Sequence, residues 1–190
     1  LRIGVLAVDP VDPQRLYAGA GPGLPFGGVY TSSDRGASWT YLADHRASTL
    51  VVDPQDPRRL HANVWGVDSG WMVSSLDRGV SWTVVAFRYA RGFKGILALA
   101  IDPREARTLY ASVSSAGVFK SGDRGESWTA TGLSDTTCAL DPDCFESPHN
   151  YQSLTVDPRN SQTLYAGAGP GFPEEGQGGV HKSEDGGTSW

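Results

Sequence analysis

The stretch "SGDRGESW", residues 121–128, decides the fold because the chain contains it in four versions. The others are "SSDRGASW" at 32–39, "SLDRGVSW" at 75–82 and "SEDGGTSW" at 183–190, so all four read S-x-D-x-G-x-S-W. A catalytic residue is needed once per site, whereas recurring self-similarity is typical of repeat architectures. We therefore expect the repeated carboxylates and tryptophans to belong to the frame of the protein.

A second phrase precedes each copy of the motif. It reads "VDPVDPQRLYAG" at 8–19, "VDPQDPRRLHAN" at 52–63, "IDPREARTLYAS" at 101–112 and "VDPRNSQTLYAG" at 156–167, and its first Asp and its Leu are always seven residues apart. A short apolar run stands before each phrase, and such runs are typical of strands buried on both faces. The proline after the Asp ends the strand because it cannot donate to a β-ladder.

Each unit therefore contains four short strands: the apolar run, the "LYAG" segment, the "GGV" segment and a last strand that begins at "SWT". Four strands in a repeated unit of about 40–50 residues predict a β-propeller blade. We expect an all-β fold, a single partial β-propeller domain over residues 1–190. The fourth unit lacks almost all of its last strand. The four consecutive four-stranded antiparallel blades are expected at about 1–44, 48–88, 95–133 and 152–190, with a loop insertion at 133–151.

The motif and the phrase together resemble the Asp-box, or BNR repeat, of sialidase-like β-propellers. The set of BNR-repeat propellers includes sialidases, xyloglucan-cleaving hydrolases, sortilin-type receptors and photosystem assembly factors. The resemblance covers essentially all 190 residues. It implies a propeller of six or more blades, of which this chain is a fragment. It specifies the fold better than the function, because this fold hosts enzymes and binders alike.

The chemistry of the motif predicts that it holds the third and fourth strands of each blade together. The resemblance implies the same role. Its Asp can accept hydrogen bonds from turn amides, its Gly can supply a positive φ, and its Trp can cover the base of the hairpin. The residues expected in this structural role are Ser32, Asp34, Gly36, Trp39, Ser75, Asp77, Gly79, Trp82, Ser121, Asp123, Gly125, Trp128, Ser183, Asp185, Gly187 and Trp190.

The composition argues against two classes of function. The formal net charge is −5 and the 16 Lys and Arg residues are thinly spread, whereas nucleic-acid binders depend on many cationic contacts to phosphate. The longest pure apolar run, "ILALAI" at 96–101, is far shorter than the ~20 residues of a membrane helix. We therefore expect no nucleic-acid partner and no membrane span. No cofactor is expected, and the oligomeric state is left open.

The two cysteines, Cys138 and Cys144, flank a five-residue segment of the loop insertion. They are expected to form a small disulfide, with a pair of reduced thiols as the alternative. A disulfide would indicate an oxidising compartment, so we expect a secreted or cell-envelope protein of the bacterial periplasm or exterior. No metal site is expected, because no histidine pair completes a zinc site and the nearby aspartates match no standard calcium loop.

Strand direction separates two faces in each blade, because alternate connections lie on opposite faces. The first-to-second and third-to-fourth turns have constant length, whereas the distance from the second-strand Leu to the third strand is 12, 11, 8 and 15 residues. Binding residues concentrate on loops held by a rigid scaffold, so we place the binding surface on the variable face. Packing against neighbouring strands is the alternative role for its aromatics. The expected ligand-binding residues are Trp65, Trp71, Arg88, Tyr89, Arg91, His149 and Tyr151.

Two functions are compatible with the sequence. We favour a binding or scaffold module that presents its variable face to a glycan or a protein, because every repeated acidic residue has a structural explanation. The alternative is a secreted glycoside hydrolase, sialidase-like or xyloglucanase-like, which needs two carboxylates about 5–9.5 Å apart. A sialidase would also need an arginine cluster, and "RIG" at 2–4 is not the Arg-Ile-Pro phrase of that family. The carboxylates eligible by location are Asp68, Asp135, Asp143 and Glu174, unless the pair lies in blades beyond this chain.

Overall fold

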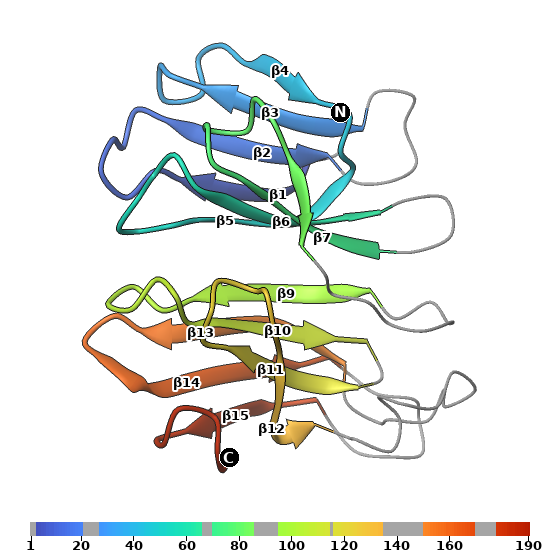
Figure 1. Cartoon of the computed structure of the whole chain (residues 1–190), viewed down its shortest axis with the longest axis vertical. Coiled ribbons are helices and arrows are strands. Elements are labelled where there is room, and N and C mark those ends of the chain that lie inside the picture. Colours follow the sequence, from blue (N-terminus) through green and yellow to red (C-terminus); the bar gives the residue numbers. More distant parts are fainter. Residues whose placement is uncertain are drawn as a thin grey trace. The chain divides into compact units, whose positions relative to one another are not determined.

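The computed structural model describes residues 3–20, 27–65, 70–85, 95–114, 116–134, 150–169 and 178–190, with Trp65 and Gly70 described by their backbone alone. Every regular element in these ranges is a β-strand (Figure 1). The chain divides into two compact units, Leu1–Val85 and Ala86–Trp190, and each is described by itself.

The first unit contains two four-stranded sheets. Its strands are β1 (Ile3–Val8), β2 (Leu16–Ala20), β3 (Gly28–Ser32), β4 (Thr40–Ala43), β5 (Ala47–Val52), β6 (Leu60–Trp65), β7 (Gly70–Ser75) and β8 (Thr83–Val85). The second unit contains one four-stranded and one three-stranded sheet. Its strands are β9 (Ile96–Ile101), β10 (Leu109–Val113), β11 (Gly117–Ser121), β12 (Thr129–Ser134), β13 (Tyr151–Asp157), β14 (Asn160–Ala168) and β15 (Val180–Ser183).

In each sheet the strands pair in chain order, and every pair is antiparallel. A four-stranded meander repeated along a chain is the blade of a β-propeller. The all-β propeller fold expected from the sequence is therefore confirmed. The fourth sheet has three strands in the described residues, as expected for a unit that lacks almost all of its last strand.

The register of the second and third strands repeats in all four sheets. The Leu that closes the seven-residue spacing always lies opposite the Ser that opens the motif, and both side chains point to the same face. This pairing places the Asp-Pro turn and the S-x-D-x-G-x-S-W turn at one edge of every sheet. The four pairs are Leu16 with Ser32, Leu60 with Ser75, Leu109 with Ser121 and Leu164 with Ser183.

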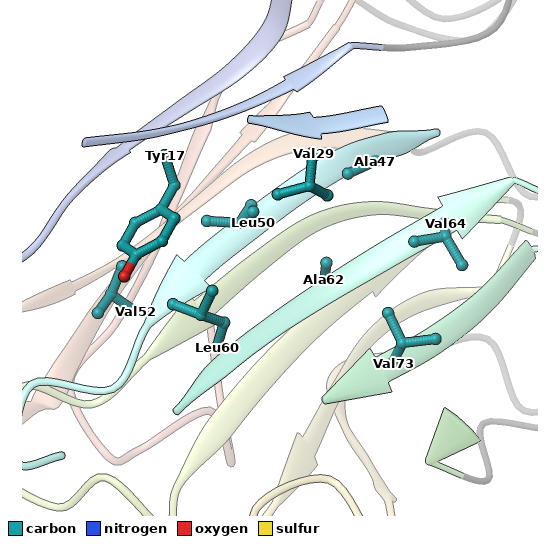
Figure 2. Close-up of a cluster of buried hydrophobic side chains, with 9 residues drawn as sticks. All are labelled: Tyr17, Val29, Ala47, Leu50, Val52, Leu60, Ala62, Val64 and Val73. Carbon is teal, nitrogen blue, oxygen red and sulfur yellow. The ribbon is translucent and has the colours of Figure 1, made fainter. Parts of the chain in front are cut away.

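The core of the first unit lies between its two sheets (Figure 2). Tyr17 and Val29 from the first sheet belong to the same buried cluster as Leu50, Val52 and Leu60 from the second. Full burial of an aliphatic side chain stabilises the fold by about 1.5–3 kcal/mol. The two sheets therefore pack face to face, through alternate residues of their strands.

The second unit repeats this arrangement. Tyr110 of β10 clusters with Val156 and Leu164 of the following sheet, and Val118 of β11 clusters with Tyr151. The apolar runs expected to be buried on both faces are buried in β5 and β9. The run in β13 is buried on one face alone, and the run in β1 is largely exposed. Leu6 of β1 is 63% exposed, whereas Leu50 at the same position of β5 is 4% exposed. The difference arises because the first sheet covers β5, while no sheet of the first unit covers that face of β1.

Candidate functional site

The four copies of the motif form identical hydrogen-bonded turns, which we call clasps: residues 32–39, 75–82, 121–128 and 183–190. In the first clasp the hydroxyl of Ser32 donates to Asp34 Oδ1 at 2.6 Å. The amide of Ser38 donates to the same oxygen at 2.9 Å, and its hydroxyl donates to Asp34 Oδ2 at 2.5 Å. The amide of Gly36 donates to Ser32 Oγ at 2.8 Å. Both carboxylate oxygens are thus engaged inside the turn.

The same four bonds recur in the other three clasps, with donor–acceptor distances of 2.5–2.9 Å. In each clasp the Trp indole N–H also donates to the Gly carbonyl, as Trp39 does to Gly36 at 3.1 Å. The clasp glycines have φ near +90°, a conformation that favours Gly. The residue before each glycine also has positive φ, and in three clasps it is an arginine: Arg35, Arg78 and Arg124.

The hydrogen bonds lower the pKa of each clasp aspartate from 3.8 to about 2. At Asp34 the largest cause is the hydroxyl of Ser32. In the other three clasps it is the hydroxyl of the residue four positions after the Asp. A carboxylate that ionises at so low a pH is poorly matched to general acid catalysis near neutral pH, which needs a pKa close to the working pH.

Each clasp is also bonded to the Asp-Pro turn of its own sheet. The amide of Arg35 donates to the carbonyl of Gln14 at 2.9 Å, and the other three sheets have the equivalent bond at 2.8–2.9 Å. The Asp-Pro turn is itself capped by its aspartate, since Asp9 Oδ1 accepts from the amides of Val11 and Asp12. Asp53 and Asp102 cap their turns in the same way.

These capping aspartates were missed in the sequence, where the Asp-Pro pair was interpreted only through its proline. Asp9, Asp53 and Asp102 are nearly fully buried, and a buried carboxylate is unfavourable unless hydrogen-bonded. The sequence does contain a signal for these caps. In an Asx-turn the Asp side chain accepts from backbone amides a few residues later, and here those amides lie two and three residues after the Asp.

The fourth clasp contacts the preceding sheet as well. The hydroxyl of Tyr110 and the ammonium of Lys120 both donate to the carbonyl of Gly186, each at 3.2 Å. The amide of Gly132 donates to the carbonyl of Gly187 at 2.9 Å. Residues of one sheet therefore bind the backbone of the next sheet's clasp.

In the first unit the second clasp makes an apolar version of this contact. Trp82 packs against the core cluster and meets His45 edge to face, with ring centroids 5.8 Å apart. A methyl group added at Gly79 would lie 3.0 Å from Leu42 Cδ1 of the preceding sheet. The clasp therefore has two contacts, one within its hairpin and one with the neighbouring sheet.

The clasps and the Asp-Pro turns share one edge of each sheet, which we call the clasp edge, and the opposite edge is the loop edge. The loop edge carries the connections β2–β3, β6–β7, β10–β11 and β14–β15. The alternating direction of the strands predicted this separation. The repeated carboxylates lie on the clasp edge, away from the variable connections.

Trp71 is the expected ligand-binding side chain that the structure places on the surface of the loop edge. It is the second residue of β7, lies opposite Val64 and is 40% exposed. The first and third sheets have glycines at this register position, Gly28 and Gly117. A methyl group on Gly28 would lie 2.7 Å from the carbonyl oxygen of Ala43, and one on Gly117 would clash with the backbone of the outer strand. Only the second sheet presents a large side chain here.

Tyr151, another expected ligand-binding residue, is buried. It opens β13, and its ring meets that of His181 edge to face at 5.4 Å. Ser112 donates to its carbonyl at 2.5 Å. The packing alternative is therefore the geometry observed for Tyr151.

The remaining expected site residues lie outside the described residues. For Trp65 the backbone is described and pairs with Gly70. The ligand-binding, catalytic and disulfide predictions that fall on undescribed positions are those for Arg88, Tyr89, Arg91, His149, Asp68, Asp135, Asp143, Glu174, Cys138 and Cys144.

Within the described ranges, no group of three or more His, Cys, Asp and Glu side chains could hold a metal ion. The same ranges contain no helix long and apolar enough to cross a membrane.

The chain is similar to solved structures of two kinds, although no protein-family model and no curated protein sequence matches it. The GH74 enzyme of Niastella koreensis is 24% identical with a TM-score of 0.71, over 95% of this chain and 28% of that one. An ancestral GH74 enzyme is 22% identical with a TM-score of 0.72, over 100% and 23%. YCF48 from Cyanidioschyzon merolae is 16% identical with a TM-score of 0.57, over 94% and 56%.

The chain thus spans about a quarter of the length of these two GH74 enzymes. Another similar structure is YCF48 bound to a D1 peptide. Identities below 25% establish the fold and not the activity. The chain therefore has the β-propeller fold that the GH74 enzymes and the YCF48 proteins share.

Proposed function

We propose that this chain is a β-propeller binding module that takes up a glycan or a protein segment at its loop edge. The observation that carries the proposal is Trp71, which is 40% exposed at a position where the first and third sheets have glycine. An exposed indole offers a flat apolar face and one N–H donor, which suit the face of a sugar ring or an apolar peptide side chain.

The electrostatics of the clasp edge support the same assignment. All four repeated carboxylates are satisfied within their own turns and have a pKa of about 2. Their hydrogen bonds to the turn explain why these carboxylates are repeated, without a ligand. This leaves the loop edge as the surface on which the four blades differ from one another.

A polysaccharide is the first ligand to test, because three similar structures are GH74 enzymes, and the one from Xanthomonas campestris is described as a xyloglucanase. A peptide is the second, because YCF48 has been solved with one. Titration calorimetry of the 190-residue chain measures its affinity for xyloglucan oligosaccharides first, and then for the members of a peptide library.

The variant Trp71→Ala should weaken binding at least about tenfold, the loss expected when an aromatic anchor is removed from an interface. Trp39→Ala is the matched control, since Trp39 is 39% exposed but lies on the clasp edge. Equal affinities for the Trp71 variant and the unchanged protein would refute the loop-edge site.

Glycoside hydrolysis is the second candidate, favoured by the three GH74 structures. It would need a carboxylate pair about 5–9.5 Å apart, drawn from Asp68, Asp135, Asp143 and Glu174 or from blades beyond this chain. Release of reducing ends from xyloglucan, abolished by replacing one of these carboxylates with its amide, would establish hydrolysis in place of simple binding.

We further propose that the protein is secreted or resides in the cell envelope, with Cys138 and Cys144 joined in a disulfide. Intact mass after treatment with iodoacetamide should show no labelling without reductant and two labels with it. Two labels without reductant would remove the argument for an oxidising compartment.

A further inference from the structure

Each unit joins two consecutive sheets through equivalent residues, but the polar contacts of the two units differ. In the second unit the hydroxyl of Tyr110 donates to the carbonyl of Gly186 at 3.2 Å. Tyr17 is the equivalent tyrosine of the first unit, because each follows the Leu that closes the seven-residue spacing. Arg78 is the equivalent of Gly186, because each precedes the glycine of its clasp. The repeat therefore predicts a bond from Tyr17 to Arg78, but the hydroxyl makes no such bond.

The hydroxyl of Tyr17 is buried without a hydrogen-bond partner. Tyr17 is fully buried, and its hydroxyl oxygen bonds to none of the described residues. Its ring lies in the core between the two sheets, in the same cluster as Val52 and Leu60 (Figure 2). Burial raises the pKa of Tyr17, so the hydroxyl keeps its proton. Most buried donors in native proteins have a partner, which can be an ordered water molecule.

None of the charged groups that act on this hydroxyl accepts its proton. Arg15 and Arg78 both act on it electrostatically, but a guanidinium group carries donors alone. The carboxylate of Asp9 acts on it as well, and the Oδ1 atom of Asp9 already accepts from two amides of its own turn. The hydroxyl of Tyr17 therefore needs an acceptor other than these side chains in direct contact.

The first unit also lacks the cation that completes this contact in the second. Lys120 lies opposite Tyr110 on the neighbouring strand, and its ammonium donates to the carbonyl of Gly186 at 3.2 Å. Thr31 lies opposite Tyr17 in the same way, but it is shorter, and its hydroxyl donates to the backbone of its own sheet. The ammonium group is about as large as a water molecule, so a water can take its position in the first unit.

We propose that the first unit binds one ordered water molecule between the hydroxyl of Tyr17 and the carbonyl of Arg78. The water accepts the proton of Tyr17 and donates to the carbonyl, in place of the direct bond that Tyr110 makes. A buried water makes about three hydrogen bonds, and in this arrangement the third goes to the carboxylate of Asp9. A metal ion is the less suitable occupant, because the guanidinium groups of Arg15 and Arg78 would repel it.

A high-resolution crystal structure of the 190-residue chain tests the position of the water directly. It should show a water molecule within about 2.7–3.2 Å of both the Tyr17 hydroxyl and the Arg78 carbonyl. A direct bond between these two groups, or the absence of a water between them, would overturn the proposal.

The variant Tyr17→Phe tests whether the hydroxyl has a partner in solution. It should raise the equilibrium constant for unfolding about fivefold, because it removes one hydrogen bond from the folded state. Tyr110→Phe should have a similar effect, since the hydroxyl of Tyr110 bonds directly to its carbonyl. Tyr41→Phe is the control, because Tyr41 is 51% exposed, and it should leave the constant unchanged. Urea unfolding followed by circular dichroism measures all three.

The sign of the Tyr17→Phe effect separates a bridged hydroxyl from an unpaired one. Removing a buried donor that has no partner relieves a penalty and stabilises the folded protein. An equilibrium constant for unfolding that falls in Tyr17→Phe, or stays the same, would therefore overturn the water bridge.

Discussion

The first and second clasps have the same eight-residue pattern and the same internal hydrogen bonds, but different surroundings. Trp39 of the first clasp is 39% exposed, whereas Trp82 of the second packs against the core cluster and against His45. The clasp therefore forms from its own residues, without help from a neighbouring sheet. Contact with the preceding sheet is a separate contribution, observed for the second and fourth clasps.

The largest difference between the two clasps should appear when their tryptophans are removed. Trp82→Ala should lower the free energy of unfolding of the first unit by about 3 kcal/mol, since it opens a cavity at the boundary of the core. Trp39→Ala should lower it by about 1 kcal/mol, the effect of losing a half-exposed ring. Urea unfolding followed by far-UV circular dichroism measures both. Equal losses would mean that contact with the neighbouring sheet adds nothing.

The clasp glycines sharpen the comparison at a smaller scale. Gly36 and Gly79 both have φ near +90°, so alanine at either position is strained by about 1–2 kcal/mol. At Gly79 the added methyl also lies 3.0 Å from Leu42, whereas at Gly36 its nearest neighbour is Leu16 at 3.5 Å. Gly79→Ala should therefore destabilise by about 1 kcal/mol more than Gly36→Ala, through crowding. The same urea titration tests this, and a reversed order would contradict it.

The smallest difference is expected between the clasp carboxylates. The hydrogen-bonded aspartates have a pKa of about 2 in the folded state, below the ordinary value of 3.8. The unfolded chain therefore binds more protons between pH 4 and 2, so the stability contributed by each clasp is present above pH 4 and lost as the pH falls towards 2.

Asp34→Asn and Asp77→Asn should each flatten the fall of the urea midpoint across this range, and by similar amounts, because the two turns have the same bonds. Asp44→Asn, outside the clasps, controls for the change in net charge. A slope that changes for Asp77→Asn alone would show that the neighbouring sheet and not the turn sets the pKa.

Most of the fold could be predicted from the sequence because the repeats impose it. The seven-residue spacings, the Asp-Pro phrase and the tryptophans specify four strands and their order, and the structure has that order. The sequence did not reveal that β1 is largely exposed, because an apolar run looks the same whether or not a sheet covers it.

The contacts between sheets were also missed. Tyr110 and Lys120 look like ordinary strand residues, and their bonds to Gly186 join positions more than 60 residues apart. Such a partner depends on how two sheets meet and cannot be derived from local pattern. For the candidate site, Trp71 stands out in the sequence because it breaks the repeat, and the structure shows that it is exposed. Tyr151 has the same aromatic character but is buried.

A measurement of the pKa of each clasp aspartate tests most directly whether the repeated carboxylates have a structural role. Carbon-detected NMR titration of the aspartate carboxyl groups resolves each residue separately. All four, Asp34, Asp77, Asp123 and Asp185, should titrate at a pKa of about 2. A value near 4 or above for any of them would contradict a closed hydrogen-bonded clasp and make that carboxylate a candidate for chemistry.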